Sequence, residues 1–133
     1  MDEHTTTDAV RRFLRDHIAT VAQLEILLLL QTNPQQKWPP AKIADELRAD
    51  HAGTEQQLKL LDQHALVKRD DAGSYYYAPA SPELHAAVIA VAQAYLVRRV
   101  AVIEMIYSKP SDSLRAFSDA FRLRKDEPDG SSR

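Results

Sequence analysis

The chain has 133 residues, which suits one domain with an appended element rather than two catalytic domains. It is 44% hydrophobic and 27% charged and has no cysteine, so disulfides, thiolate metal sites and cysteine nucleophiles are excluded. The net charge of -2 gives no general attraction to nucleic acid or anionic lipid, so any binding to DNA must depend on local charge.

The N-terminal part of the chain is predicted to form two helices. Apolar residues in 10–18 recur at helical spacing, with Asp8 as a candidate cap, and predict an amphipathic helix within residues 1–20. Apolar residues are denser in 21–30, which predicts a second helix buried on most of its circumference. Pro34 follows it and prevents its continuation.

The middle of the chain predicts a helix-turn-helix followed by a hairpin. Residues 41–47 and 54–64 carry helical patterns separated by a short interruption, and Thr54 is expected to face inward. Residues 66–70 and 74–78 predict two strands joined by a tight turn. We therefore expect residues 21–80 to form one domain.

The C-terminal part is predicted to be helical as well. Residues 82–107 contain no glycine and no internal proline, which predicts one helix of about 24 residues and about 36 Å. Residues 113–125 predict a short amphipathic tail helix, so that 81–126 comprise the long helix and the tail helix. Residues 127–133 are expected to be disordered.

Nothing in the sequence predicts export or membrane insertion. The N-terminus is acidic and polar, unlike a secretory signal. The longest uncharged apolar run, residues 86–97, is shorter than the ~20 residues of a membrane-spanning helix. We therefore expect a cytoplasmic protein.

The order of helix, helix-turn-helix and β-hairpin is that of a winged helix. The sequence IADEL at 43–47, and LKLL at 58–61 followed by ALVKR at 65–69, resemble bacterial winged helix-turn-helix regulators of the MarR-like kind. The second passage is similar to the family pattern L-x-x-L-x-x-x-G-L-V, with Ala65 where glycine is usual. Residues 98–124 also resemble the tail of small bacterial winged-helix proteins of unassigned function, which implies no activity.

The resemblance implies a mainly α fold with one β-hairpin, in which a winged helix-turn-helix precedes a long dimerisation helix and a short tail helix. It also implies a transcription regulator that binds duplex DNA, with the second helix of the turn in the major groove. The implied base-reading positions are Ala52, Gly53, Glu55, Gln56 and Lys59, with Gln57 added if the helix is rotated slightly. Lys59, Lys68 and Arg69 are the implied phosphate contacts. The alternative is that Gln56, Gln57 and Lys59 form an ordinary solvated face.

Charge favours a second hypothesis. Residues 38–79 contain five basic and seven acidic residues, whereas a typical DNA-binding module has a basic surplus. The acidic turn at 70–73 also disfavours insertion of the wing into the minor groove. Basic residues elsewhere could supply the positive charge that residues 38–79 lack, or they could simply form the solvated faces of two amphipathic helices. These residues are Arg11, Arg12, Arg15, Arg115, Arg122, Arg124 and Lys125. The second hypothesis is a winged-helix protein-interaction module whose partner is a membrane-bound or transcription-associated protein.

The long predicted helix carries two apolar stripes. The first consists of Ile89, Leu96, Val100, Ile103 and Tyr107, and the second of Val88, Val91, Tyr95, Val102 and Met105. One stripe can cover the chain's own domain, and the other predicts a two-fold homodimer. We assign the dimer contact to the first stripe, with Phe117 and Phe121 docking on it; alternatively, the tail helix covers the stripe within one chain. Such a dimer would recognise an inverted repeat.

Catalytic and metal-binding patterns are missing from the sequence. The five histidines lack metal-ligand spacing, and no glycine-rich loop follows a strand. We therefore predict neither an enzyme nor a bound metal or cofactor.

Overall fold

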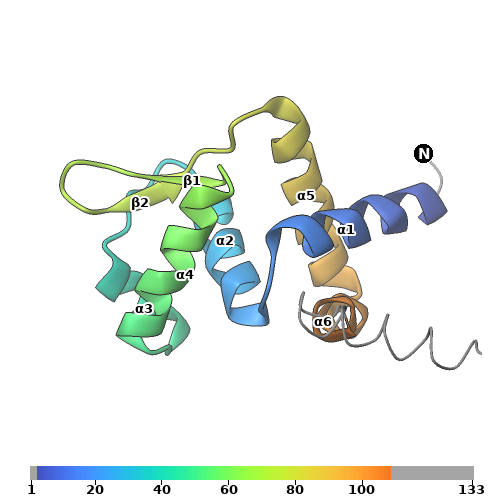
Figure 1. Ribbon diagram of the computed structural model, residues 1–133, viewed down its shortest axis with the longest axis horizontal. Helices are drawn as coiled ribbons and strands as arrows, with labels where there is room; N and C mark the ends of the chain where they lie inside the picture. The colour runs from blue at the N-terminus through green and yellow to red at the C-terminus, as the bar shows by residue number, and fades with distance from the viewer. Residues whose placement is uncertain (1–2, 109–133) are drawn as a thin grey trace, which may run out of the picture.

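The computed structural model describes residues 3–108, and side chains from Thr7 onward. This part of the chain has six helices and one two-stranded antiparallel hairpin, which confirms the predicted mainly α fold class (Figure 1). The elements are α1 (Glu3–His17), α2 (Val21–Thr32), α3 (Pro40–Leu47), α4 (His51–Gln63), β1 (Val67–Arg69), β2 (Tyr75–Tyr77), α5 (Pro82–Val97) and α6 (Arg99–Ser108). The predicted tail helix and disordered end lie outside the described residues.

The elements form two lobes, which lie side by side in Figure 1. The winged lobe consists of α2, α3, α4 and the hairpin, and the three-helix lobe consists of α1, α5 and α6. One continuous apolar core runs through both, from Val10 and Phe13 on α1 to Leu58 on α4 and Val91 on α5. The lobes are therefore parts of one folding unit.

Local signals account for the starts of the helices in the winged lobe. Thr20 caps α2, because its hydroxyl accepts a hydrogen bond from the Gln23 amide at 3.1 Å. Pro40 occupies the first position of α3, where a missing N–H costs nothing. Asp50 caps α4 by accepting from the Gly53 amide at 2.6 Å. As a result α4 begins at His51, before the start predicted from its apolar pattern.

The first helix also differs from its prediction. It begins at Glu3, so Asp8 lies inside α1 and is not its cap. The polar first turn carries no apolar periodicity, and therefore the sequence pattern detected only the part of α1 that packs against α5 and α6.

The hairpin is tied to the helix-turn-helix by a third extended segment. Strands β1 and β2 pair with Lys68 opposite Tyr76, and the Asp70 carboxylate accepts from the Ala72 and Ser74 amides at 3.0 and 2.9 Å to form the turn. Trp38, between α2 and α3, exchanges two backbone hydrogen bonds of 2.8 Å with Tyr75. The wing is thereby fixed to the segment that leads into α3.

The prediction of a single helix over 82–107 is wrong. The chain breaks between α5 and α6, and the two helix axes meet at 117°. Neither glycine nor proline causes the break; instead, the bend returns α6 to α1, where Val102 and Ile106 are buried. A straight helix would carry these two side chains away from the core, so burial of apolar area favours the bend.

Within residues 3–108, no single helix is both long and apolar enough to cross a membrane. Only α5 and α6 taken together reach that length and composition, and they are the sharply bent pair.

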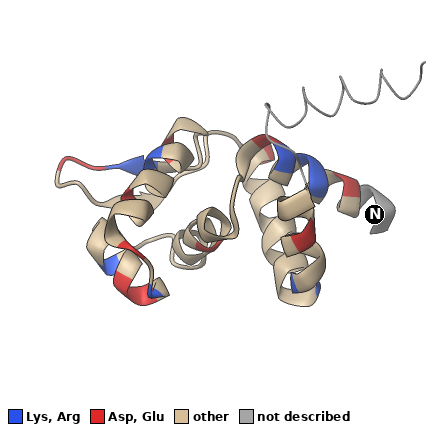
Figure 2. Cartoon of the chain, turned by 60° about the horizontal axis from the view of Figure 1, so that its bottom comes forward, with Lys and Arg blue, Asp and Glu red and all other residues tan. Residues whose placement is uncertain are grey.

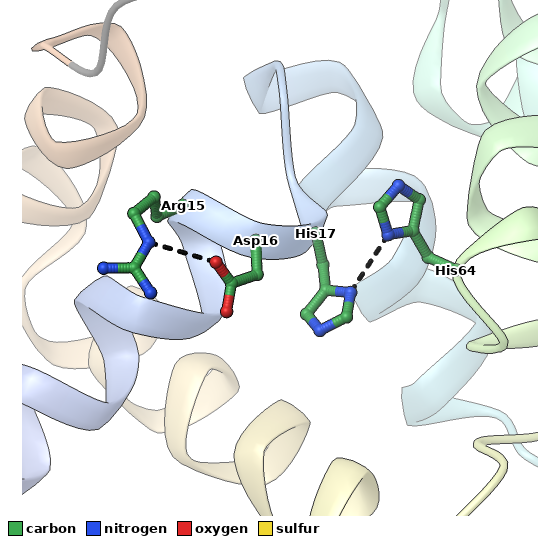
Figure 3. Close-up of polar contacts among 4 residues, drawn as sticks. All are labelled: Arg15, Asp16, His17 and His64. Atoms are coloured by element: carbon green, nitrogen blue, oxygen red, sulfur yellow. Dashed lines mark hydrogen bonds and ion pairs between the residues drawn. The ribbon is translucent and has the colours of Figure 1, made fainter.

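The first link between the lobes lies where α1 and α4 end. His17 and His64 face one another with their Nδ1 atoms 3.0 Å apart, one donating a hydrogen bond to the other (Figure 3). Phe13 packs on the His17 ring with 4.9 Å between ring centroids. Arg15 and Asp16 pair with each other at the exposed side of α1. The C-terminal end of α4 is therefore held by the three-helix lobe.

Two further links involve α5 and α6. The Tyr77 hydroxyl and the His85 Nδ1 atom are hydrogen-bonded at 2.7 Å and connect β2 to α5. The Tyr95 hydroxyl and Arg99 both donate to Glu25 Oε2 on α2, at 2.9 and 3.2 Å. Burial raises the pKa of Tyr95, and the hydrogen bond to the Glu25 carboxylate raises it further. Glu25 thus links α2 to both α5 and α6 by hydrogen bonds.

Candidate nucleic-acid interface

The outer face of α4 carries most of the predicted base-reading residues. Ala52, Glu55, Gln56 and Lys59 are all exposed, and their spacing places them on one side of the helix. Gly53, also predicted as a reader, is half-buried. The opposite side is fixed in the core by its buried residues, which are Thr54, Leu58 and Leu61. The expectation that Thr54 faces inward is confirmed.

Gln57 lies apart from the other predicted readers. Its side chain is half-buried, and its Oε1 atom is buried without a hydrogen-bond partner. It lines a cavity on the inner side of α4, together with Ile26 of α2. Gln57 was included as a reader only for a slightly rotated α4. The helix is not rotated in this way, so Gln57 is not part of the exposed face.

The two predicted phosphate contacts of the wing lie on β1. Lys68 and Arg69 are both exposed, and in Figure 2 the basic colour of this strand contrasts with the acidic tip of the hairpin. The Arg69 guanidinium lies over the turn, where a Cβ at Gly73 would be 3.4 Å from its Nη2 atom. Gly73 has a φ of 88°, a conformation that residues with a side chain rarely adopt, so the turn favours glycine for its backbone and not for lack of space.

Some of the acidic residues in this lobe have structural roles. The carboxylate of Asp70 binds two amides of the hairpin turn, and that of Asp50 caps α4. Asp45 pairs with His51 at 2.9 Å, on the exposed side of the helix-turn-helix. Part of the acidic surplus in residues 38–79 is therefore explained by local folding.

Sequence reasoning missed Lys37. Its ammonium lies 5.4 Å from the centroid of the Tyr76 ring and 3.9 Å from Asp70 Oδ2, next to the hairpin. The backbone pairing of Trp38 with Tyr75 brings it there. Its position directly before Trp38 could have drawn attention to it. However, no sequence pattern predicts that this segment pairs with the hairpin.

The arginines of α1 do not lie beside the exposed face of α4. Arg11, Arg12 and Arg15 are exposed on the three-helix lobe, which contacts α4 through its C-terminal end (Figures 1 and 3). The remaining basic residues proposed as compensation, 115–125, lie outside the described residues. The described part of the chain thus leaves six lysines and arginines in the winged lobe, which are Lys37, Lys42, Arg48, Lys59, Lys68 and Arg69.

The two apolar stripes of the predicted long helix separate as expected. In the first, Leu96, Val100 and Tyr107 are 85%, 68% and 71% exposed, while Ile89 and Ile103 are half-buried. The second stripe faces the chain's own core, with Val88, Val91 and Val102 buried and Tyr95 and Met105 half-buried. The break after Val97 distributes the exposed stripe over two helices. Phe117 and Phe121 lie outside the described residues.

Among residues 3–108, no group of three or more histidine, aspartate or glutamate side chains is arranged to hold a metal ion.

Comparison with known proteins gives matches in solved structures alone. No model of a known protein family matches the sequence, and no curated protein does. Similar solved structures include the transcriptional regulator Tm0710 from Thermotoga maritima, with 19% identity, a TM-score of 0.48, and coverage of 98% of this chain and 91% of that one. The reduced form of MarR from E. coli has 15% identity, a TM-score of 0.46 and coverage of 94% and 90%. A mutant MarR from E. coli complexed with operator DNA has 16% identity, a TM-score of 0.45 and coverage of 94% and 90%. The chain is thus similar to these three solved structures over nearly its whole length.

Proposed function

We propose that this protein is a transcription regulator that binds duplex DNA as a homodimer, with α4 in the major groove. The observation that carries the proposal is the outer face of α4, where Ala52, Glu55, Gln56 and Lys59 are exposed together. The inner face is fixed by buried Thr54, Leu58 and Leu61, so the helix presents this surface rigidly. A rigid helix with small and polar side chains on one exposed face suits entry into the major groove.

Each side chain has a distinct role in the proposal. Gln56 pairs with adenine through its amide, and Glu55 accepts from the amino group of cytosine. Lys59, Lys68 and Arg69 bind phosphates and position the helix. We leave Gln57 out of the base-reading set, because its side chain is turned to the inner side of α4.

The proposed dimer uses the exposed stripe on α5 and α6. Leu96, Val100 and Tyr107 are large apolar side chains exposed on two consecutive helices, and a group of such side chains is typical of an interface. Two copies related by a two-fold axis would bury this surface and present two α4 helices to successive major grooves. The expected target is an inverted repeat with half-sites about 34–36 Å apart.

The test is selection of genomic DNA fragments by the purified full chain at about 0.15 M salt, where non-specific attraction to phosphate is already weak. We expect enrichment of an inverted repeat. The double variant Lys59→Glu/Lys68→Glu should lose most of the affinity and flatten its salt dependence. Arg11→Glu/Arg12→Glu on α1 is the matched control, since it changes the net charge equally but lies on the other lobe. Equal loss in both double variants would exclude α4 and the wing as the DNA surface.

A second candidate function is a protein-interaction module. The observation that favours it is the surplus of acidic residues in the segment that contains α4 and the wing. If a folded dimer enriches no DNA sequence, this candidate replaces the first. A pull-down in which the full chain retains only itself would then exclude it.

A further inference from the structure

The bend between α5 and α6 is made at one residue, Arg98. Helix α5 ends at Val97, α6 begins at Arg99, and the two axes meet at 117°. Residues 83–107 contain neither glycine nor proline, and their apolar stripes continue through the break at helical spacing. The sequence at the break is therefore compatible with one continuous helix, in which the amides of residues 99–101 would bond to the carbonyls of residues 95–97.

The bent form leaves apolar surface uncovered around the break. Leu96, Val97 and Val100 all lie within two residues of it and are at least 68% exposed. They are three of the four large apolar side chains that are exposed among the described residues. On the inner side of the bend, a half-open cavity of about 210 Å³ lies between α1, α5 and α6, with Val10 and Met105 among its walls. Apolar packing is therefore incomplete on both sides of the bend.

The contacts that hold α6 are of a kind that another copy of the chain can make. Val102 and Ile106 are buried because the bend returns α6 to α1 of the same molecule. A straight helix carries α6 away from its own α1, but α1 of a second copy offers an identical surface. If two copies exchange their α6 helices reciprocally, both side chains are buried again by the same contacts.

The polar link to α2 is compatible with a straight helix. Tyr95 and Arg99 both donate hydrogen bonds to Glu25 Oε2, and the Arg99 guanidinium lies 4.8 Å from the centroid of the Tyr95 ring. These two residues are four positions apart, so a continuous helix keeps their side chains next to each other on one face. The link to Glu25 therefore does not oppose straightening of the bend.

We propose that two copies of the chain dimerise by exchanging α6. In each copy α5 and α6 straighten into one helix, and α6 packs through Val102 and Ile106 on α1 of the second copy. The exposed side chains of Leu96, Val97 and Val100 from the two copies then meet where the straightened helices cross at the two-fold axis. The inference deepens the proposed dimer and rests on it, whereas it does not depend on binding to DNA.

The first experiment uses the absence of cysteine from the chain. Arg11 on α1 and Glu104 on α6 are exposed and line the same surface hollow. In the full chain with Arg11→Cys/Glu104→Cys, a short bismaleimide joins the two positions within one chain if α6 stays, and between two chains if α6 is exchanged. We expect covalent dimers as the main product on a denaturing gel, well above the background that the two single-cysteine variants give. Cross-links within one chain only, in a protein that sediments as a dimer, would overturn the exchange.

The second experiment blocks the straight helix. Arg99 is the first residue of α6, a position that accepts proline, whereas in a continuous helix it is internal and proline breaks the helix there. Arg99→Pro should weaken dimerisation by at least about a hundredfold, or about 2.8 kcal/mol. Arg99→Ala is the matched control, because it also loses the hydrogen bond to Glu25 and should dimerise like the wild type. Equal dimerisation of the two variants would overturn the proposal, and the cross-linking test remains decisive if Arg99→Pro does not fold.

The outcomes separate the exchange from the proposed function. A wild type that is monomeric in sedimentation would refute the exchange together with the dimer. A dimer that is cross-linked only within each chain would refute the exchange and leave the dimer and its DNA target in place. Cross-links between chains in a protein that enriches no DNA sequence would support the exchange and refute the regulator.

Discussion

The winged lobe and the three-helix lobe differ in how completely their large apolar residues are buried. In the winged lobe, large apolar residues such as Leu27 and Leu58 are buried by the lobe's own elements. In the three-helix lobe, Leu96, Val100 and Tyr107 are exposed, although the same two helices bury a second stripe. Among the described residues, the large apolar side chains that remain exposed therefore lie on the three-helix lobe, where we propose that a second copy covers them.

The largest expected effect concerns stability. Leu27→Ala removes a fully buried side chain of the winged lobe and should lower the free energy of unfolding by about 2–5 kcal/mol. Leu96→Ala makes the same change at an exposed site and should alter the free energy of the monomer by no more than about 0.5 kcal/mol. Urea unfolding at low protein concentration measures both. Similar losses in the two variants would contradict the difference between the lobes.

The next effect concerns assembly. Leu96→Glu places a charge in the proposed dimer contact and should weaken dimerisation by at least about 2 kcal/mol, or about thirtyfold. Sedimentation velocity over a range of concentrations should show a shift from dimer to monomer. Gln63→Glu adds the same charge at an exposed position of α4 and serves as the control. A monomeric wild type would disprove the dimer outright.

A smaller effect tests the backbone of the winged lobe. Ala65 has a φ of 63°, a left-handed conformation that costs a residue with a side chain about 1 kcal/mol. Ala65→Gly should therefore raise the free energy of unfolding by about that amount. Ala52→Gly, within α4, should lower it by about 0.5–1 kcal/mol. Thermal unfolding of both variants measures the two changes in stability. Destabilisation by Ala65→Gly would show that the left-handed backbone at Ala65 is not strained.

The smallest effect at neutral pH concerns the link between the lobes at Tyr77. Burial raises the pKa of Tyr77 to about 12, whereas the unfolded chain ionises this group near pH 10. The unfolded state thus releases the proton first, so the stabilisation persists below about pH 10 and is lost as the pH approaches 12. Tyr77→Phe should flatten the decline in stability across this interval.

At neutral pH, Tyr77→Phe loses only the hydrogen bond to His85. The free energy of unfolding should then fall by an amount at the low end of about 0.5–1.5 kcal/mol. Tyr76→Phe, on the same strand, is the control for the alkaline titration. An equally steep decline in Tyr77→Phe and the wild type would mean that the hydroxyl does not couple to folding.

The winged lobe was predictable because its signals are local. Pro40 marks the start of α3, and the turn at 71–73 separates two strand patterns. The bend at Arg98 was not predictable in this way, since it arises from burial of Val102 and Ile106 against α1, which is distant in sequence. The beginning of α1 was missed because its first turn is polar on all sides.

The candidate interface was predicted in part for the same reason. The spacing of Glu55, Gln56 and Lys59 places them on one face of any helix, whatever the tertiary structure. The orientation of Gln57 depends on how α4 is rotated against α2, which is set by packing and not by spacing. Lys37 required knowledge of the pairing between Trp38 and Tyr75. Long-range contacts thus mark the limit of what the sequence revealed.

The position of Trp38 also determines how unfolding can be observed. It is the only tryptophan of the chain, it is 4% exposed, and it is paired with the hairpin, so its fluorescence reports on the winged lobe alone. Helical circular dichroism, by contrast, averages over both lobes. If the molecule unfolds in one step the two signals coincide, whereas separate melting of the three-helix lobe would leave the fluorescence unchanged while ellipticity falls. The protein therefore carries its own spectroscopic test of whether its two lobes behave as one cooperative unit.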